Sequence, residues 1–198
     1  SRNNNQWNQQ YQGDFTDDDA LAMAIAMSLQ DSGGVVADDL PERPKPTGYG
    51  VESKLISQTT LPSGLVIQIR HGDMTQEKVD VIVNAANKHL DHSAGLAGAM
   101  VREGGKSVQD WSDIYINTYG KLQEGDVVVA PDAGKMKCKR IFHAVGPIYR
   151  KGHTGEADTL RKCIHTCLTN LHNLKLASIS IPAISSGIFN FPKPLCYR

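Results

Sequence analysis

Small polar residues gather at three places in the sequence, each shortly after a run rich in apolar residues. These are Gly72-Asp73 after residues 65–70, Asn84-Ala85-Ala86-Asn87 after residues 79–83, and Ser185-Ser186-Gly187-Ile188-Phe189 after residues 177–181. A carboxylate such as that of Asp73 can accept a hydrogen bond from an exocyclic amine, and asparagine amides can bond ribose hydroxyls. A Ser-Ser-Gly turn lets backbone N–H groups approach a phosphate. Together the three segments have the chemistry to bind a nucleotide diphosphate.

A fourth segment, Ser93-Ala94-Gly95-Leu96-Ala97-Gly98, leads into a predicted helix. Small residues at a helix start let a phosphate approach the N–H groups at the positive end of the helix dipole. No Gly-Lys-Ser/Thr follows the glycines, so this is not a Walker A loop, and it does not match the dinucleotide-binding fingerprint either. Each segment alone is equally compatible with a tight turn that binds nothing. Their order and spacing together favour a binding site.

Strands and helices alternate from about Lys54 onward. Apolar and β-branched runs predict strands, and amphipathic or helix-favouring stretches predict helices. The predicted strands are residues 65–69, 79–83, 126–130, 140–145 and 177–181, and the predicted helices are residues 95–103, 108–119 and 156–174. This alternation is typical of a layered α/β domain with a largely parallel sheet. In such sheets ligands bind beyond the carboxyl ends of the strands, where the polar segments would lie.

Four strings in this region resemble the macrodomain family. They are Gly72-Asp73-Met74-Thr75, Val79-Asp80-Val81-Ile82-Val83-Asn84-Ala85-Ala86-Asn87, Ile141-Phe142-His143-Ala144-Val145-Gly146-Pro147, and Ile181-Pro182-Ala183-Ile184-Ser185-Ser186-Gly187-Ile188-Phe189. Phe191-Pro192 adds a resemblance to the tandem macrodomains of animal ADP-ribosyltransferases. The resemblance runs from about Val51 to the end of the chain. It implies a three-layer α/β/α macrodomain with a mixed, mostly parallel sheet.

The resemblance also implies a ligand, ADP-ribose, and no cofactor. Asp73 would hold the adenine amine, with the backbone of Met74 beside it. Asn84 and Asn87 would supply side-chain amides, and Asn87 would contact the distal ribose. The other implied contacts are Gly95, Leu96 and Ala97 along the diphosphate and distal ribose, the backbone N–H groups of Ser185, Ser186, Gly187 and Ile188 around the diphosphate, and Phe189 near the distal ribose.

Two departures from the family pattern bear on catalysis. Many relatives have three glycines where this chain has Ser93-Ala94-Gly95, and relatives that hydrolyse ADP-ribose from proteins often have an aspartate where Ala97 stands. Without that aspartate, activating a water would fall to Asn87, to His92 or to a phosphate of the substrate. Asn87 can orient a water, whereas His92 could act as a base or simply be a solvated or backbone-bonded histidine. We therefore expect a module that binds free or protein-linked mono-ADP-ribose; the alternative is a hydrolase that removes mono-ADP-ribose from acidic residues of proteins.

The family pattern normally continues beyond the Phe-Pro string through a helix, a strand and a final helix. Here the sequence stops at Arg198. We therefore expect residues 51–198 to be a macrodomain that lacks this last helix-strand-helix unit, as a fragment would. The missing strand would lie beside residues 177–181, and its loss would expose a sheet edge.

The first 50 residues have a different composition. Residues 1–14, mostly Asn and Gln with some Gly, predict a disordered tail, and the proline- and glycine-rich residues 32–50 predict a linker. Between them, residues 15–31 resemble a ubiquitin-interacting motif, a short helix that begins with acids. The residues that would contact the partner share one face of this helix and are Leu21, Ala24, Ile25, Ser28 and Leu29. This implies weak binding to ubiquitin or ubiquitinated proteins; a helix that packs on the domain or stays solvated is the alternative.

Charge and hydropathy exclude some classes of protein. The chain has 198 residues, with 21 basic and 21 acidic side chains, so its net charge is zero. Proteins that grip nucleic acid usually carry a basic excess, which leaves single-stranded nucleic-acid binding as a disfavoured alternative. No apolar run approaches the roughly 20 residues of a membrane span, and the N-terminus has no secretory pattern. We expect a nuclear or cytoplasmic protein that does not bind membranes.

The cysteines and histidines offer two further possibilities. Cys163, His165 and Cys167 share a predicted helix, but His165 points away from the face of the two cysteines, so core packing is favoured over a metal site. Cys138 and His143 flank a predicted strand, yet nothing in the sequence would activate that thiol. We therefore predict neither a metal site nor a cysteine nucleophile.

Overall fold

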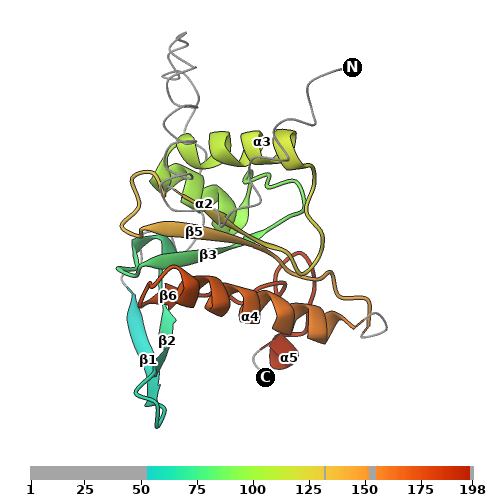
Figure 1. Ribbon diagram of the computed structural model, residues 1–198. Coiled ribbons are helices and arrows are strands. Elements are labelled where there is room, and N and C mark those ends of the chain that lie inside the picture. Colours follow the sequence, from blue (N-terminus) through green and yellow to red (C-terminus); the bar gives the residue numbers. More distant parts are fainter. Residues whose placement is uncertain (1–52, 132, 152–154, 197–198) are drawn as a thin grey trace, which may run out of the picture. The chain divides into compact units, whose positions relative to one another are not determined.

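A computed structural model of the chain describes residues 53–131, 133–151 and 155–196. These residues form a layered α/β domain (Figure 1), as the sequence predicted. The predicted tail, ubiquitin-interacting helix and linker all lie outside the described residues.

A four-stranded sheet forms the middle layer. Its strands are β3 (Val81–Ala86), β4 (Val127–Ala130), β5 (Arg140–Val145) and β6 (Ile179–Ser180). Their order across the sheet is β4-β5-β3-β6. β3 is parallel to both β5 and β6, and β4 is antiparallel to β5. The sheet is therefore mixed and mostly parallel.

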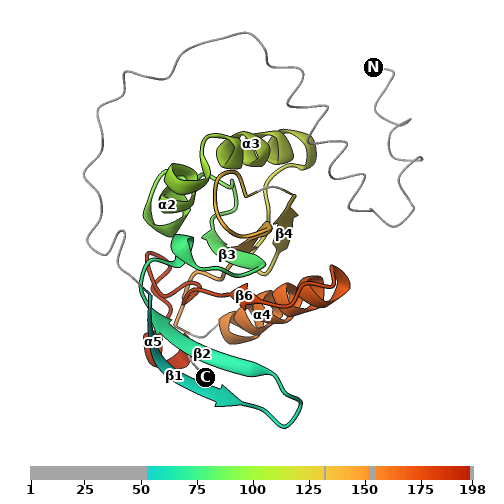
Figure 2. The ribbon, with the colours of Figure 1, turned by 90° about the vertical axis from the view of Figure 1, so that its left-hand side faces the viewer.

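Helices cover both faces of this sheet. α2 (Gly95–Gly104) and α3 (Ser107–Tyr119) lie on one face, and α4 (Glu156–Asn173) lies on the other (Figure 1 and Figure 2). Successive side chains of a strand point to opposite faces, so each face of a central strand needs apolar residues. Val81 and Val83 pack in the cluster on the α4 side, whereas Ile82 packs in the cluster that includes Met100 and Val108 of α2 and α3. This double burial explains the continuous apolar run of β3.

The apolar face of α4 holds its two cysteines in the core. Leu160 and Cys167 pack in the cluster on the sheet, and the side chains of Cys163 and Cys167 are fully buried while His165 is exposed. Burial raises the pKa of the Cys163 thiol to about 11 and that of Cys167 to about 12, so both stay neutral. The core-packing interpretation of this helix is confirmed. Among the described residues, no cluster of histidines, cysteines and acids is suited to a metal ion.

The end of β3 differs from the sequence prediction. The pattern predicted a strand over residues 79–83 and a loop from Asn84 to Asn87, but the strand extends from Val81 to Ala86. Asn84 thus lies within the strand, opposite His143 of β5 in the parallel register. Two alanines and an asparagine are weak strand formers, yet pairing with β5 and an internal hydrogen-bonding partner for the Asn84 amide outweigh this preference.

A separate hairpin precedes the central sheet. β1 (Lys54–Thr60) pairs antiparallel with β2 (Val66–His71), and among the described residues this pair forms a sheet of its own. The sequence predicted the second strand but not the first, which is largely polar after Ile56. Every residue of both strands is exposed, including large apolar side chains: Leu55, Ile56, Val66, Ile67 and Ile69. In both views the hairpin lies on the opposite side of the central sheet from α2 and α3 (Figure 1 and Figure 2).

Two short helical segments complete the described fold. A 3-10 helix, η1 (Met74–Gln76), follows the hairpin, and α5 (Lys193–Cys196) follows β6. None of the helices in the described ranges combines the length and the apolar character that crossing a membrane requires.

Candidate ligand-binding site

The parallel strands bring several predicted site segments to one edge of the sheet. Because β3, β5 and β6 are parallel, their carboxyl ends lie at the same edge. The chain leaves this edge through three loops, residues 87–94 after β3, residues 146–151 after β5 and residues 181–192 after β6. Two of them contain segments that the sequence singled out. Ligands of open α/β sheets bind at such an edge.

The loop after β6 offers free backbone donors. Ser185 adopts a left-handed conformation with φ of 67°, which is rare for a residue with a Cβ. The Phe191 N–H donates to the Ser185 carbonyl at 2.9 Å, which closes the loop. Within the described part of the chain, the N–H groups of Gly187, Ile188 and Phe189 have no hydrogen-bond partner. The side chain of Ile188 is 89% exposed. Three consecutive N–H groups are thus available to an anion.

The loops after β5 and β6 are packed against each other. A Cβ on Gly146 would lie 2.1 Å from Ser185 Oγ and 2.4 Å from Ile184 Cγ2, so only glycine fits at this position. The Tyr149 N–H donates to the Phe189 carbonyl at 2.9 Å. These contacts fix the loop that carries the free donors, and they explain the Gly146-Pro147 end of one family string.

The loop after β3 is organised by Asn87. Its Nδ2 donates to the Asp91 carbonyl at 2.9 Å, and its Oδ1 accepts from the N–H groups of His89 at 3.0 Å and Asp91 at 3.1 Å. The sequence predicts that Asn87 contacts the ligand and can orient a water. Its amide has one remaining hydrogen that a ligand could accept, so the loop-building role and the binding role are compatible.

The start of α2 offers a second set of backbone donors. Its N-cap, Ala94, makes no side-chain cap, and the N–H groups of Gly95, Leu96 and Ala97 have no partner within the described ranges. Gly95 has φ of 61°, whereas Ala94 is extended with φ of −147°. Glycine is therefore needed at position 95 but not at 94, which explains why the chain tolerates a departure from the triple glycine. The positive end of the helix dipole favours an anion here.

Asp73 is built into the chain reversal that follows β2. It caps η1, because its Oδ1 accepts from the Thr75 N–H at 3.0 Å and from Thr75 Oγ1 at 2.6 Å. Its side chain is buried. Met74 and Leu96 pack against the same core cluster, so η1 lies beside α2. Gln76 Nε2 of η1 donates to Glu103 Oε2 of α2 at 2.9 Å, so the η1 turn that Asp73 caps is held against α2.

A buried polar network lies beneath these loops. Asn84 Nδ2 lies 3.0 Å from His143 Nδ1 and 3.3 Å from His92 Nδ1, and His92 Nε2 lies 2.8 Å from Ser112 Oγ. The rings of His92 and His143 stack with centroids 4.8 Å apart, and Trp111 stacks on His143. Burial lowers the pKa of His92 to about 4 and that of His143 well below its ordinary value. Both imidazoles are therefore neutral at pH 7.

This network argues against two sequence-based assignments. His92 was assigned as a possible base, but it is buried and both of its ring nitrogens have hydrogen-bonding partners. It has no free nitrogen with which to take a proton from a water. Asn84 was assigned to the ligand, but it is fully buried and its amide faces the two histidines. Its strand position turns it toward the core, which the pattern alone did not predict.

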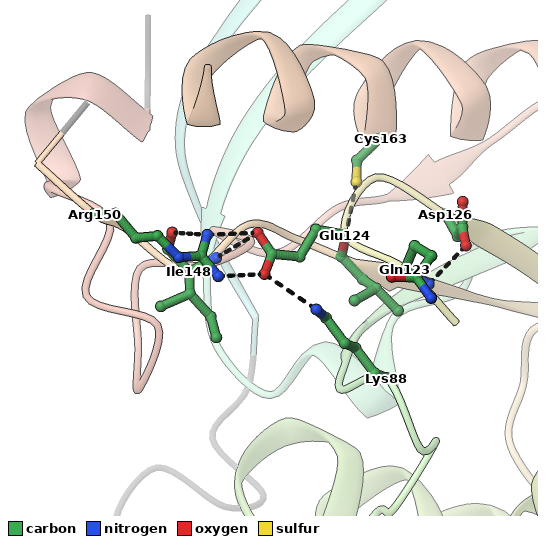
Figure 3. A network of polar contacts seen from close by, with 8 residues as sticks. Lys88, Gln123, Glu124, Asp126, Ile148, Arg150 and Cys163 are labelled. Atoms are coloured by element: carbon green, nitrogen blue, oxygen red, sulfur yellow. Dashed lines mark hydrogen bonds and ion pairs between the residues drawn. The ribbon is translucent and has the colours of Figure 1, made fainter. Parts of the chain in front are cut away.

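An ion-pair network that the sequence did not predict joins the loops after β3 and β5 (Figure 3). Glu124 accepts from Arg150 through both carboxylate oxygens, at 2.7 and 2.9 Å, and Lys88 Nζ lies 3.3 Å from Glu124 Oε1. Lys88 belongs to the loop after β3 and Arg150 to the loop after β5. The hydrogen bond from Arg150 is the main reason that the pKa of Glu124 falls to about 2. No sequence signal connects these three distant charges.

Comparison with protein families and relatives identifies the domain. The pattern of the Macro domain family matches residues 83–198. An O-acetyl-ADP-ribose deacetylase of Salmonella gallinarum is 38% identical over 64% of this chain and 70% of its own length. A Thermotoga maritima protein is 48% identical over 75% of this chain, and the mouse protein mono-ADP-ribosyltransferase PARP9 is 35% identical over 77%. The matches span only 25% of the Thermotoga protein and 18% of PARP9.

Solved structures agree with this. The Oceanobacillus iheyensis macrodomain with ADP has a TM-score of 0.66 and 28% identity, covering 71% of this chain and 74% of that one. The Trypanosoma brucei macrodomain in complex with ADP-ribose has a TM-score of 0.55 and 27% identity, covering 64% and 50%. With three layers, a mixed sheet and the family pattern over more than half of its length, the chain belongs to the macrodomain family.

Proposed function

We propose that this macrodomain binds ADP-ribose, free or as the mono-ADP-ribose group of modified proteins. The observation that carries the proposal is the pair of free backbone donor sets, one at the start of α2 and one at residues 187–189, attached to neighbouring parallel strands. A diphosphate has many acceptor oxygens and two negative charges, so it suits a site made of N–H groups and a positive helix end. The macrodomains solved with ADP and with ADP-ribose support the same ligand class.

In this proposal the two ends of the ligand are distinguished by side chains. Asp73, with the Met74 backbone, accepts a hydrogen bond from the adenine amine. Gly95, Leu96 and Ala97 line one side of the diphosphate. The opposite side is formed by the loop with Ser185, Ser186, Gly187 and Ile188, in which the Ser186 N–H already donates to the Ala183 carbonyl at 3.2 Å and Gly187 and Ile188 supply free N–H groups. The distal ribose meets Asn87 and Phe189.

Isothermal titration calorimetry with ADP-ribose tests the proposal. Asp73→Asn is the most informative variant because an asparagine Oδ1 can still cap η1, whereas its amide would present hydrogens to the adenine amine. We expect unsubstituted protein to bind and Asp73→Asn to weaken binding by about tenfold or more, the cost of a mismatched buried polar contact. Asp126→Asn is the matched control, because Asp126 also accepts a backbone hydrogen bond, from the Gln123 N–H.

Two outcomes of the titrations would reject different parts of the proposal. No heat of binding from folded, unsubstituted protein would reject ADP-ribose as the ligand. Equal affinity of folded Asp73→Asn and unsubstituted protein would reject the assigned adenine contact. To distinguish mono-ADP-ribose from other forms, the same titration is repeated with a mono-ADP-ribosylated peptide and with its unmodified form.

Hydrolysis of an ADP-ribose ester is the second candidate function. It is favoured by the similarity to the Salmonella O-acetyl-ADP-ribose deacetylase. His92 is buried, so in this chain a water would be oriented by Asn87 or activated by a phosphate of the substrate. Incubation with O-acetyl-ADP-ribose and with a protein carrying mono-ADP-ribose on acidic residues tests this function. Product release that an Asn87→Ala variant loses would support it, and no release from protein that binds ADP-ribose would leave binding as the function.

Ubiquitin binding by residues 15–31 is proposed from the sequence alone. Leu21, Ile25 and Leu29 provide apolar contacts, and the small residues Ala24 and Ser28 let a partner surface come close. The full chain is titrated with ubiquitin, and an Ala24→Arg/Ser28→Arg double variant should lose the weak binding while keeping its affinity for ADP-ribose. Unchanged ubiquitin binding in the double variant would refute the motif. We further propose a nuclear or cytoplasmic location, which imaging of a tagged chain tests.

A further inference from the structure

The loop that leads into α2 is held from behind by two side chains of α3. Gln109 Oε1 accepts from the His92 N–H at 3.0 Å, and Gln109 Nε2 donates to the Leu90 carbonyl at 3.1 Å. Ser112 Oγ lies 2.8 Å from His92 Nε2. Asn84 of β3 contacts the other ring nitrogen of His92. Residues 90–92 are therefore fixed through both backbone and ring.

The hydrogen-bond directions in this network follow from one contact. Ser112 Oγ donates its only hydrogen to the Val108 carbonyl at 3.1 Å, so it accepts from His92 Nε2–H. A neutral His92 then has a bare Nδ1, which accepts one hydrogen of Asn84 Nδ2. The other hydrogen goes to His143 Nδ1 at 3.0 Å. The network therefore selects one tautomer of His92.

The network is a poor way to stabilise a core. Asn84 Oδ1 and His143 Nε2 are buried without a partner among the described residues. A partly satisfied polar network is less stable than an apolar core of the same shape, so stability alone does not account for these residues. Their contacts converge on the loop before α2. The His92 carbonyl lies 3.3 Å from where a Cβ on Gly98 would stand, so this loop packs directly on α2.

We propose that Gln109, Ser112 and Asn84 are positioning residues for the ligand. They do not touch it; they fix His92 and the loop at residues 90–94, and thereby the direction in which the free N–H groups of residues 95–97 point. This inference rests on the proposed binding of ADP-ribose. It assigns a role in recognition to a helix, α3, that has no residue in the predicted site.

Alanine substitutions along α3 test the proposal. Ser112→Ala removes the acceptor of His92 Nε2–H, and Gln109→Ala removes both of its contacts with the loop. Alanine has the highest helix propensity, so neither substitution should destabilise the helical conformation of α3. Thr118→Ala is the matched control on the same helix: Thr118 Oγ1 donates to the carbonyl four residues earlier, Ile114, as Ser112 does to Val108, but has no contact with the loop.

Two measurements are made on each folded variant of the full chain. Calorimetry with ADP-ribose should show binding about tenfold weaker for Ser112→Ala and several-fold weaker for Gln109→Ala, because displaced binding groups lose large factors in affinity. Nitrogen-15 NMR of the imidazoles should show a single Nε2–H tautomer of His92 in the unsubstituted protein and a mixture in Ser112→Ala. Thr118→Ala should match the unsubstituted protein in both measurements.

Each other outcome overturns a defined part of the inference. Folded Ser112→Ala with unchanged affinity would reject the positioning role, and so would lost affinity with an unchanged His92 tautomer. If Ser112→Ala does not fold, the partly exposed Gln109→Ala decides, and its unchanged affinity would reject the role. If the unsubstituted protein does not bind ADP-ribose, the proposed function fails first, and this inference fails with it.

Discussion

Two apolar strands of this chain differ in burial. Residues 81–83 (Val-Ile-Val) of β3 are 0% exposed, whereas Val66 and Ile67 of β2 are 49% and 46% exposed. Both runs are short, β-branched and favourable to strands. The difference lies in their neighbours: β3 pairs on both edges and is covered on both faces, whereas β2 pairs only with β1 in the part of the chain that the structure describes. An apolar pattern therefore predicts a strand without predicting its burial.

The contrast has a consequence for function as well as for stability. A strand that is packed on both faces holds the loop at its carboxyl end firmly. β3 holds residues 87–97 in this way. The neighbouring strands β5 and β6 hold the loop that contacts Glu124 and the loop that contains Ser185. Within the described residues, β1 and β2 pair only with each other and carry exposed apolar side chains, a combination that in proteins favours association with other chains.

The largest effect is expected from a polar substitution in the buried strand. Ile82→Thr should lower the free energy of unfolding by about 2–4 kcal/mol, through lost apolar burial and a buried hydroxyl. Threonine keeps the β-branched shape, so strand propensity is not the cause. Urea unfolding followed by circular dichroism measures the change. A loss below about 0.5 kcal/mol, the range of surface substitutions, would break the comparison.

The second-largest expected effect is a loss of folding stability at acidic pH, caused by the buried histidines. An unfolded histidine titrates near pH 6.5, whereas folded His92 has a pKa of about 4, because burial outweighs the opposing charges of Asp91 and Asp113. The unfolded state therefore binds the proton first, and stability is lost as pH falls from 6.5 toward 4. For His92 alone the loss between pH 7 and pH 5 should be about 2 kcal/mol. His143 adds in the same direction.

Urea unfolding at both pH values and constant salt measures this loss. In a His92→Asn variant, which cannot titrate at that position, the difference between pH 7 and pH 5 should shrink. An equal pH dependence in the variant would show that His92 is not its source.

A smaller effect is expected from the ion pairs that join the loops. Glu124→Gln should cost about 1 kcal/mol at pH 7, since Arg150 is exposed and its ion pair is screened by water. Because the pKa of Glu124 falls from 4.5 to about 2 on folding, this contribution is present above pH 4.5 and is lost as pH falls toward 2. Asp158→Asn, which removes the highly exposed pair with Arg161, is the control and should change little. Equal costs for the two variants would contradict a special role for the Glu124 network.

The smallest effect is expected in the hairpin. Ile69→Thr should change the free energy of unfolding by less than about 0.5 kcal/mol, because Ile69 is 62% exposed. It should also reduce concentration-dependent association, measured by analytical ultracentrifugation, since it removes part of an apolar surface. A cost close to that of Ile82→Thr would show that the hairpin is covered in solution. This matched pair is the most direct test of the contrast between the two strands.

Much of the fold followed from sequence periodicity. The predicted strand at residues 140–145 and the helix from Glu156 agree with the structure because long, regular patterns specify the element strongly. The predicted strand at residues 177–181 is longer than the observed one: among the described residues, only Ile179 and Ser180 of this segment form ladder pairs, with β3. The extent of a strand depends on its pairing partner, and periodicity carries no information about the partner.

The sequence predicted some parts of the candidate site better than others. The loop at residues 185–189 stood out because its composition is unusual and backbone donors do not depend on side-chain orientation. Asn84, predicted to contact the ligand, is buried because β3 extends three residues beyond the predicted end and turns its side chain toward the core. His92, predicted as a possible catalytic residue, is buried in the following loop by its contacts with Asn84 and Ser112. Glu124 and Arg150 were missed because isolated charges in loops carry no spacing signal.

By itself, the sequence determined the layered α/β class, the family and the segments that could bind a diphosphate, because all of these are recorded in local patterns and strings. Tertiary structure alone decided which polar side chains face the ligand edge and which are buried, and which apolar strand is covered. These properties arise from contacts between residues far apart in the chain, such as Asn84 with His143 or Lys88 with Glu124 and Arg150. Burial and hydrogen-bond satisfaction are determined by those contacts, and no local pattern contains them.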